Sequence, residues 1–213
     1  MKPIIFSTPM VRALLNTKPG VWPAEPIDPG KPCKSMTRRI IKPRYRRNES
    51  GFKVATGKNG RSIMILNEEG GDSRYYNPPY DVGDILWVRE TFTPVNDGSY
   101  LHRADPRYDG CGPGDFGWKW SSPRFMPREA ARIFLEVKSV RIERLNEVSE
   151  EDATAEGVGI NLRTSFRKDE FPHLWDSING KKKGCSWEDS PWVFVYEFMR
   201  VNKQEDMDAR IDN

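Results

Sequence analysis

The chain has 213 residues, of which 37% are hydrophobic and 31% charged, and its formal net charge is +3. This length is typical of one large domain or two small ones, and seven Trp with ten Phe indicate a packed core rather than a disordered chain. No apolar run approaches the roughly 20 residues needed to cross a bilayer, and the opening residues lack the apolar segment of a signal peptide. We therefore expect a cytoplasmic protein rather than a secreted or membrane protein.

The N-terminal third predicts few regular elements. Ile4–Phe6 is a short apolar run that predicts a buried strand, and Pro9 suits the first turn of a short amphipathic helix that follows it. Residues 18–33 hold five prolines and two glycines, too many for a regular element. We expect a loop there, held to the surface by Trp22.

Apolar and alternating runs predict strands over the rest of the chain, with two helices near its end. The clearest strand covers residues 85–91, which follow a Gly-Asp turn, and the longest covers residues 133–145. A capping serine, Ser149, begins a short helix that ends at Gly157. Further strands are predicted at 39–42, 52–54, 63–66 and 192–198, and a second helix at 167–178 that packs Phe171, Leu174, Trp175 and Ile178.

These elements do not alternate as βαβ units, so they predict an α+β fold. We expect a mixed, mostly antiparallel β-barrel with flanking short helices. It would form a single domain over residues 1–201, with loop insertions near 18–33, 44–80 and 94–128 and a flexible tail over 202–213. No dinucleotide-binding or P-loop glycine pattern is present, which disfavours those nucleotide-binding folds.

The net charge conceals an asymmetry. Residues 1–61 have a balance of +11, and residues 62–213 a balance of −8. The densest basic stretch runs from Lys34 to Arg47, which indicates an anionic partner, with phosphate the usual one. The alternative is a solvated basic face without a ligand.

The cysteines and histidines do not predict a metal site. Cys33, Cys111 and Cys185 are widely spaced, and the only histidines are His102 and His173, whereas a zinc site needs clustered ligands. We expect reduced thiols, no metal and no cofactor.

Residues 34–39 bring an amine, two hydroxyls and two guanidiniums together. In a helical turn, Lys34 and Thr37 would share a face, and the amine could act as base toward the hydroxyl if its pKa were lowered. Arg38 and Arg39 could lower that pKa and hold a phosphate. The alternative is a basic loop with ordinary capping hydroxyls.

Four segments together resemble the ASCH domain family, and most closely its long phage and prophage members. They are residues 6–11, FSTPMV; residues 34–39, KSMTRR; residues 83–90, GDILWVRE; and the closing run 192–201. The likeness covers nearly the whole chain, including residues 149–157 and 171–179. It implies a PUA-like β-barrel and recognition of RNA or a modified nucleoside.

Small bacterial members of that family are amidohydrolases acting on N4-acetylcytidine. They use a lysine, a threonine three residues later and a distant glutamate, which here match Lys34, Thr37 and Glu156. The resemblance implies that Thr37 is the nucleophile or orients water, and that Lys34 is its base or stabilises the oxyanion. It implies that Glu156 handles the proton of the leaving amine or holds the edge of the base. The chain is longer than these enzymes, and its insertions could reshape or replace the pocket.

Other charged and aromatic residues are candidates for contacts with the partner. Glu90 ends the strand 85–91 and is a second candidate acid, which would pair with Arg38 or Arg39; it is otherwise the place where the strand meets water. Trp87 and Trp175 lie in periodic apolar segments and are predicted core residues. The predicted nucleic-acid contacts are Arg38, Arg39, Arg44, Arg46, Lys119 and Trp120. For the segment with Lys119 and Trp120, the alternative is that it anchors a long loop.

Several functions remain open at this stage. The leading one is binding of RNA or a modified nucleoside, with DNA as a further nucleic-acid partner, extended to hydrolysis of the N4-acetylcytidine amide. The second is metal-independent RNA cleavage, since a Lys, Arg and Thr site could stabilise a phosphorane. The third is a non-enzymatic phage adaptor that binds nucleic acid, or a protein partner through its insertions.

Overall fold

The computed structural model describes residues 1–41, 52–56, 62–66, 74–108, 115, 119–157 and 167–202. The chain divides into two compact units, each made of segments that lie far apart in the sequence. Unit 1 comprises Met1–Ser35, Asp84–Glu136 and Met199–Asn213, and unit 2 comprises Met36–Gly83 and Val137–Phe198. Two long strands, β9 (Phe134–Arg144) and β10 (Trp192–Val201), contribute residues to both units.

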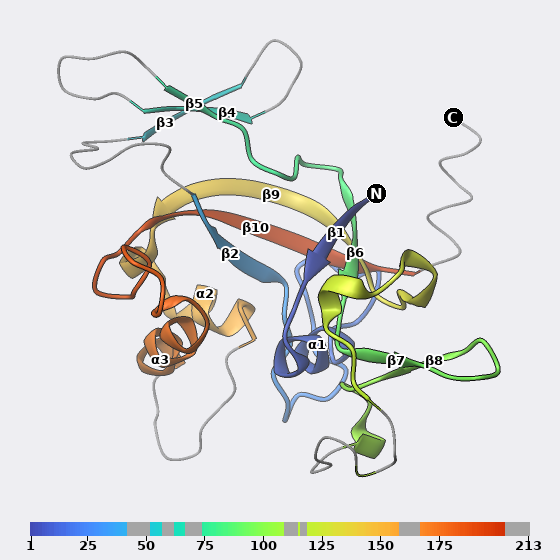
Figure 1. Ribbon diagram of the computed structural model, residues 1–213. Helices are drawn as coiled ribbons and strands as arrows, with labels where there is room; N and C mark the ends of the chain where they lie inside the picture. The colour runs from blue at the N-terminus through green and yellow to red at the C-terminus, as the bar shows by residue number, and fades with distance from the viewer. Residues whose placement is uncertain are drawn as a thin grey trace. The chain divides into compact units, whose positions relative to one another are not determined.

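The fold is α+β with mostly antiparallel strands, as predicted. The main sheet has five strands in the order β1-β6-β9-β10-β2, and smaller sheets have three and two strands (Figure 1). The described strands form these separate sheets, and no closed barrel is found among them. Among the described residues, no helix is both long and apolar enough to cross a membrane.

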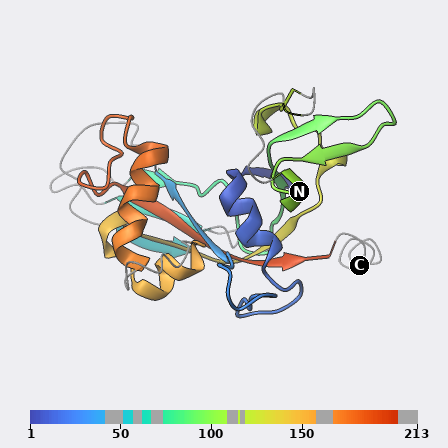
Figure 2. The ribbon, with the colours of Figure 1, turned by 90° about the horizontal axis from the view of Figure 1, so that it is seen from below.

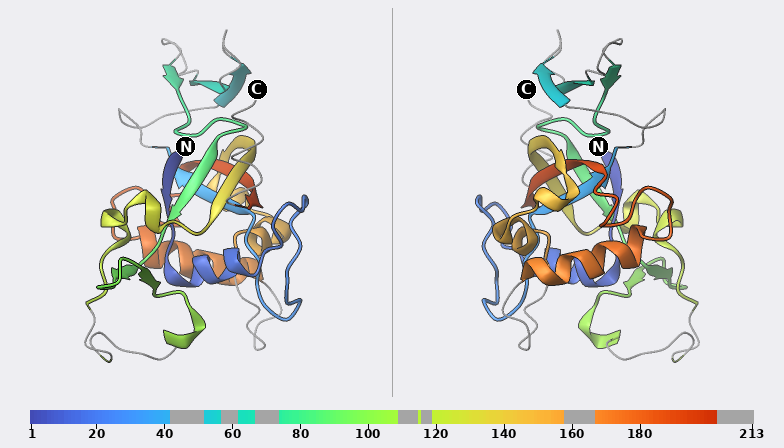
Figure 3. Two further views of the ribbon diagram at one scale, coloured as in Figure 1. Left: turned by 90° about the vertical axis from the view of Figure 1, so that its right-hand side faces the viewer. Right: turned by 90° about the vertical axis from the view of Figure 1, so that its left-hand side faces the viewer.

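In unit 1, β1 (Lys2–Ile5) pairs in parallel with β6 (Ile85–Arg89), and β6 pairs antiparallel with the start of β9 (Figure 3). Successive side chains of a strand point to opposite faces. Ile4 and Val88, which are partners in the register, are buried together, whereas the next residue, Ile5, is 44% exposed. The predicted strand at 4–6 therefore begins earlier and buries only one face.

The helix α1 (Thr8–Leu15) carries Pro9 in its first turn, as predicted, and buries Val11 and Leu14. The loop that follows is held by Asn16 rather than by Trp22. The Asn16 amide nitrogen lies 3.0 Å from the carbonyl oxygens of both Asp28 and Lys31. Trp22 is 41% exposed, so the prediction that it anchors the loop is wrong.

The region predicted as an irregular insertion, 94–128, contributes to the core of unit 1. It contains β8 (Tyr100–His102), which pairs antiparallel with β7 (Phe92–Pro94) (Figure 2). Met126 packs in a buried cluster with Trp87, Phe92, Ala130, Ala131, Phe134 and Val201. Strands of three residues are too short to produce a detectable period, which is why the sequence pattern missed them.

In unit 2, β2 (Met36–Ile40) pairs antiparallel with β10. The strand starts three residues before the predicted one, and Thr37 is part of it. The helical turn considered for Lys34–Thr37 is therefore wrong. The strand's early start follows from alternation, because Met36 packs in the core while Thr37 lies on the opposite face.

Two helices of unit 2 match their predicted positions. In α2 (Glu150–Ala155) the Ser149 hydroxyl accepts a hydrogen bond from the Asp152 backbone N–H. Gly157 takes a left-handed conformation, with φ of 81°, just beyond the helix. The second helix, α3 (Arg167–Asn179), packs against α2.

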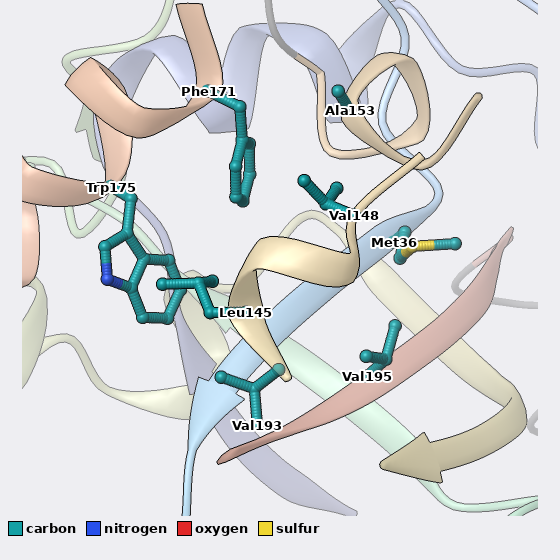
Figure 4. Packing of buried hydrophobic residues seen from close by; sticks show 8 residues of the cluster. All are labelled: Met36, Leu145, Val148, Ala153, Phe171, Trp175, Val193 and Val195. Atoms are coloured by element: carbon teal, nitrogen blue, oxygen red, sulfur yellow. The ribbon is translucent and has the colours of Figure 1, made fainter. Parts of the chain in front are cut away.

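A buried cluster joins these helices to the strands of unit 2 (Figure 4). Phe171 and Trp175 lie in it as predicted, whereas Ile178 is exposed. Ile178 lies in the last turn of α3, whereas Leu174 is partly buried and packs against the cluster. The cluster comprises Met36, Leu145, Val148, Ala153, Phe171, Trp175, Val193 and Val195.

Unit 2 also contains an antiparallel three-stranded sheet, formed by β3 (Phe52–Thr56), β4 (Ser62–Leu66) and β5 (Arg74–Tyr76). The strands predicted at 52–54 and 63–66 are confirmed, and the third was not predicted. The other predicted strands, at 85–91, 133–145 and 192–198, correspond to β6, β9 and β10.

Candidate functional site

Strand β2 divides its polar residues between two faces. Thr37 lies opposite Tyr196 in the register with β10, and Arg38 lies opposite Val195. Because residues directly opposite each other share a face, Thr37 faces the same side as Tyr196, and Arg38 faces the side of Val195. The run of hydroxyl and guanidinium groups seen in the sequence is thus separated into two environments.

Arg38 lies in an ion-pair network inside unit 2. Its side chain is fully buried, and its Nη2 atom lies 2.5 Å from both Glu143 Oε1 and Asp152 Oδ2. Its Nη1 atom lies 3.3 Å from Glu156 Oε1. A guanidinium that already contacts three carboxylates is not available to phosphate. Arg38 therefore acts as a positioning residue for Glu156, and its predicted role in contacting nucleic acid is wrong.

Arg141 extends the same network. Its guanidinium contacts Glu143 at 3.2 Å, Asp152 at 2.6 Å and Glu197 at 2.5 Å. Burial lowers the pKa of Arg141, but the three neighbouring carboxylates outweigh burial and raise it overall. The charges of two arginines and four carboxylates are thus joined, which fixes the end of α2 relative to β2 and β9.

The other face of β2 carries an aromatic and polar cluster, which we call the β2 cluster: Thr37, Arg39, Tyr80 and Tyr196. The rings of Tyr80 and Tyr196 meet edge to face with 5.2 Å between their centroids. Burial lowers the pKa of the Arg39 guanidinium, and Tyr80, Glu156 and Tyr196 oppose this shift. Arg39 is therefore a desolvated cation beside two phenols and within the field of a carboxylate.

Glu156 interacts with arginines on both faces of β2. It caps the C-terminal end of α2, and α2 packs against β2, the last strand in the sheet order. Glu156 is buried, contacts Arg38 directly and acts electrostatically on Arg39.

The Tyr196 hydroxyl is buried without a hydrogen bond of standard geometry among the described residues. Burial raises the pKa of Tyr196 far above its ordinary value, and an interaction with the backbone N–H of Tyr80 opposes that shift. A neutral phenol can donate its proton and accept one hydrogen bond. Buried hydroxyls are normally satisfied, so this group has capacity to bind a ligand atom.

Lys34 belongs to unit 1. Its side chain is fully buried, its ammonium lies 5.5 Å from the centre of the Phe6 ring, and its backbone N–H donates to the Thr17 hydroxyl at 3.0 Å. Burying an ammonium is costly unless it is compensated. Lys34, Thr37 and Glu156 are all buried polar residues, which is the environment in which ionisable groups are tuned for chemistry.

Glu90 also belongs to unit 1, where its partners differ from those predicted. Arg132 contacts both carboxylate oxygens, at 2.8 and 3.0 Å, and His102 Nδ1 lies 3.4 Å from Oε1. The expected pairing with Arg38 or Arg39 is therefore wrong, as is the alternative that Glu90 meets water, because its side chain is buried. Burial lowers the pKa of His102, opposed in part by Glu90.

The remaining predicted residues lie outside these clusters. Lys119 is exposed, while the ring of Trp120 is half buried, edge to face against Tyr108 with 5.3 Å between centroids. Trp120 therefore anchors a segment of unit 1 and offers little surface to a base. Arg44 and Arg46 lie outside the described residues.

Trp87 and Trp175 are buried, which confirms them as core residues. Cys33 and Cys185 are free thiols, and Cys111 lies outside the described residues. Within the described ranges, no group of three or more histidine, cysteine, aspartate or glutamate side chains is arranged to hold a metal ion.

Sequence reasoning missed the partners that make these groups into clusters. Tyr196 appeared only as one residue of an apolar strand, although its alternation with Val195 places it on the face of Thr37. Glu143 and Asp152 carry no local motif that would connect them with Arg38, which lies 105 and 114 residues away. Comparisons with protein-family models, with curated protein sequences and with solved structures found no match.

Proposed function

We propose that the chain binds RNA or a modified nucleoside, with the base held at the β2 cluster, and hydrolyses the amide of N4-acetylcytidine. The observation that carries the proposal is the chemistry of that cluster: two tyrosines, a desolvated guanidinium and a threonine hydroxyl meet within reach of a buried carboxylate. The half-buried ring of Tyr80 can contact a base, and the polar groups, including the buried Tyr196 hydroxyl, can bind its edge.

The free hydrogen-bonding capacity of Tyr196 supports base recognition at this place. A neutral phenol can donate to a carbonyl oxygen, and Arg39 can do the same while adding a positive charge. Cytosine presents a carbonyl oxygen and a ring nitrogen next to its exocyclic amine. Donors of this kind therefore match an acylated cytosine better than an apolar ligand.

The proposed reaction balances without a cofactor. Water adds to the acyl carbon, the carbon–nitrogen bond breaks, acetate leaves with the oxygen of water, and the exocyclic nitrogen takes up a proton. As the resemblance to ASCH proteins implies, Thr37 would either orient the attacking water or attack the acyl carbon itself, in which case water then hydrolyses the acyl-threonine. Glu156 would deliver the proton to the leaving amine. We also propose the PUA-like architecture that the same resemblance implies.

The burial of Thr37 and Glu156 is the support that the fold adds. The Arg38 guanidinium lies 3.3 Å from Glu156 Oε1 and fixes the position of that carboxylate. A carboxylate in that position can accept the proton from water before passing it to the amine.

The test is incubation of the purified protein with N4-acetylcytidine and a panel of modified nucleosides, followed by mass spectrometry. We expect cytidine and acetate as products, and a loss of turnover of at least about 100-fold in Thr37→Val and Glu156→Gln. Thr93→Val is the matched control, because Thr93 is a buried threonine of unit 1 whose hydroxyl donates to the Lys119 carbonyl. Thermal unfolding must show that each variant is folded.

Binding is measured separately by calorimetry with cytidine and N4-acetylcytidine. We expect Tyr196→Phe and Arg39→Gln to weaken binding by about 5- to 100-fold, since each removes a buried hydrogen-bond donor. An absence of turnover across the panel would overturn the hydrolase. An absence of binding, or binding unchanged in both variants, would overturn the nucleoside site.

A further inference from the structure

Three arginines of unit 1 have no carboxylate partner within the described part of the chain: Arg89, Arg124 and Arg128. In the same unit, Arg107 pairs with Asp105 and Arg132 pairs with Glu90. The unit thus neutralises some of its arginines and leaves these three available to an anion. A guanidinium without a carboxylate partner is suited to bind phosphate.

Local contacts connect Arg89 with Arg124 and hold Arg128 against the first residue of the chain. The Arg89 guanidinium lies 4.6 Å from the centre of the Trp87 ring and donates to the Arg124 carbonyl at 3.2 Å. Arg128 Nη2 lies 3.0 Å from Met1 Sδ, at the start of the chain that leads into β1. In the parallel register, Ile5 of β1 lies beside Arg89 of β6.

A short 3-10 turn at Pro123–Phe125 presents an aromatic ring at this place. Met126, the next residue, is buried and accepts a hydrogen bond from the Glu90 backbone N–H, so the turn is fixed to the end of β6. Phe125 is thereby directed outward and is 74% exposed, the largest fraction among the exposed apolar residues described. An exposed phenylalanine fixed by its neighbours loses little further conformational entropy when a ligand binds.

We call this surface the Phe125 face: Ile5, Arg89, Arg124, Phe125 and Arg128. We propose that the Phe125 face binds single-stranded nucleic acid, with a base stacked on Phe125 and phosphates bound by the arginines. The proposal goes beyond the nucleoside site, because every residue of this face lies in unit 1 and none belongs to the β2 cluster.

Charge complementarity favours single-stranded nucleic acid as the partner of the Phe125 face. Three guanidiniums without described carboxylate partners, together with one exposed ring, match the alternation of phosphates and bases along a single strand. The acidic neighbour Glu129 accepts a hydrogen bond from the Tyr100 hydroxyl at 2.5 Å, and Asp84 pairs with Lys2. Both carboxylates are thus held by other groups. A protein partner would need a larger apolar patch than one phenylalanine and one isoleucine.

The experiment measures anisotropy of fluorescein-labelled 12-nucleotide strands of uridine, of thymidine and of a mixed-sequence duplex, at low salt and over a salt series. We expect both single strands to bind, because they share phosphates and bases, and the duplex to bind less tightly because its bases are not free to stack. Phe125→Ala should weaken single-strand binding by roughly 5- to 100-fold. The double variant Arg124→Gln/Arg128→Gln should reduce the slope of log K against log salt by about 1.4, since each phosphate contact contributes about 0.7 for single strands.

Arg107→Gln is the matched control, because Arg107 is an exposed arginine of the same unit that pairs with Asp105. It should bind as the unsubstituted protein does. No single-strand binding, variants no weaker than this control, or equal affinity for the duplex would each overturn the proposal. A dimer that Phe125→Ala abolishes while strand affinity stays constant would overturn it as well, and would assign the face to contact between copies.

The two proposals can fail separately. Variants of the Phe125 face should retain turnover of free N4-acetylcytidine, and Thr37→Val should retain strand affinity within about twofold. Loss of strand affinity in Thr37→Val but not in Phe125→Ala would overturn the Phe125 face and leave the nucleoside site standing.

Discussion

The arginines of the two units are used in opposite ways. In unit 2, Arg38 and Arg141 are joined to four carboxylates, and Arg38 is fully buried. In unit 1, Arg89, Arg124 and Arg128 have no described carboxylate partner, and the same unit exposes Phe125. A count of basic residues treats these groups alike, yet the first set stabilises a fold and the second remains available to a ligand.

The largest effect that this comparison predicts is that of Arg38→Met. The substitution removes the buried guanidinium that contacts Glu143, Asp152 and Glu156. Breaking a buried pair by removing one partner costs about 3–5 kcal/mol, which urea denaturation will measure. Arg124→Met should change the free energy of unfolding by less than about 0.5 kcal/mol, as is usual for surface substitutions. Equal losses in the two variants would contradict the comparison.

A smaller effect is expected for Glu90→Gln, which tests the buried ion pair of unit 1. The substituted amide would keep the shape of the side chain but replace the charged hydrogen bonds to Arg132, so we expect a loss of about 1.5–3 kcal/mol. The cost should stay below that of Arg38→Met because the Arg132 side chain is 30% exposed and water can solvate it. Glu25→Gln is a suitable control, since Glu25 makes an exposed pair with Lys18.

The pH dependence of stability provides a third test within unit 1. Burial lowers the pKa of His102 in the folded state, so the unfolded chain binds the proton more readily. Stability from this group is therefore present above the ordinary histidine pKa of about 6.5 and is lost as the pH falls toward the folded value. The slope cannot exceed about 1.4 kcal/mol per pH unit for one group.

His102→Gln should reduce that slope between about pH 6.5 and pH 5, as measured by denaturation at a series of pH values. His173→Gln, at an exposed position of α3, is the control. An unchanged slope in His102→Gln would show that His102 does not contribute to acid destabilisation.

The smallest effect concerns the capping of α2, which carries Asp152 and leads to Glu156. The Ser149 hydroxyl accepts from the Asp152 backbone N–H at 3.1 Å, and loss of such a cap in Ser149→Ala costs about 1 kcal/mol. Ser122→Ala, in unit 1, removes a longer contact of 3.4 Å to Arg124 N and should cost less. Calorimetric unfolding of both variants provides the measurement, and a larger loss in Ser122→Ala would reverse the ranking.

The elements with a clear period or a clear cap were predictable from the sequence. The strands β6, β9 and β10 and the helices α1, α2 and α3 lie close to their predicted positions because alternation, capping and proline placement act over a few residues. The short pair β7 and β8 was missed because three residues do not establish a period. The start of β2 was placed late because its alternating residues are charged rather than apolar.

The candidate site was also predictable only in part from the sequence. Sequence alone singled out Lys34, Thr37, Arg38, Arg39 and Glu156, and the structure buries Lys34, Thr37, Arg38 and Glu156. The sequence did not show that the Arg38 guanidinium contacts carboxylates, or that the Arg39 guanidinium lies next to tyrosines. That distinction depends on residues more than 100 positions away, such as Glu143 and Asp152.

The sequence by itself determined the α+β class, most of the long elements and the clustering of basic residues near the N-terminus, because each of these follows from local periodicity or composition. Only the tertiary structure determined which partner each charged side chain has. It paired Arg38 with three carboxylates and Glu90 with Arg132, and it left Arg124 and Arg128 near an exposed phenylalanine in the chain. The physical reason is that the free energy of a charge depends on its burial and its neighbours, and in a fold those neighbours come from distant parts of the chain.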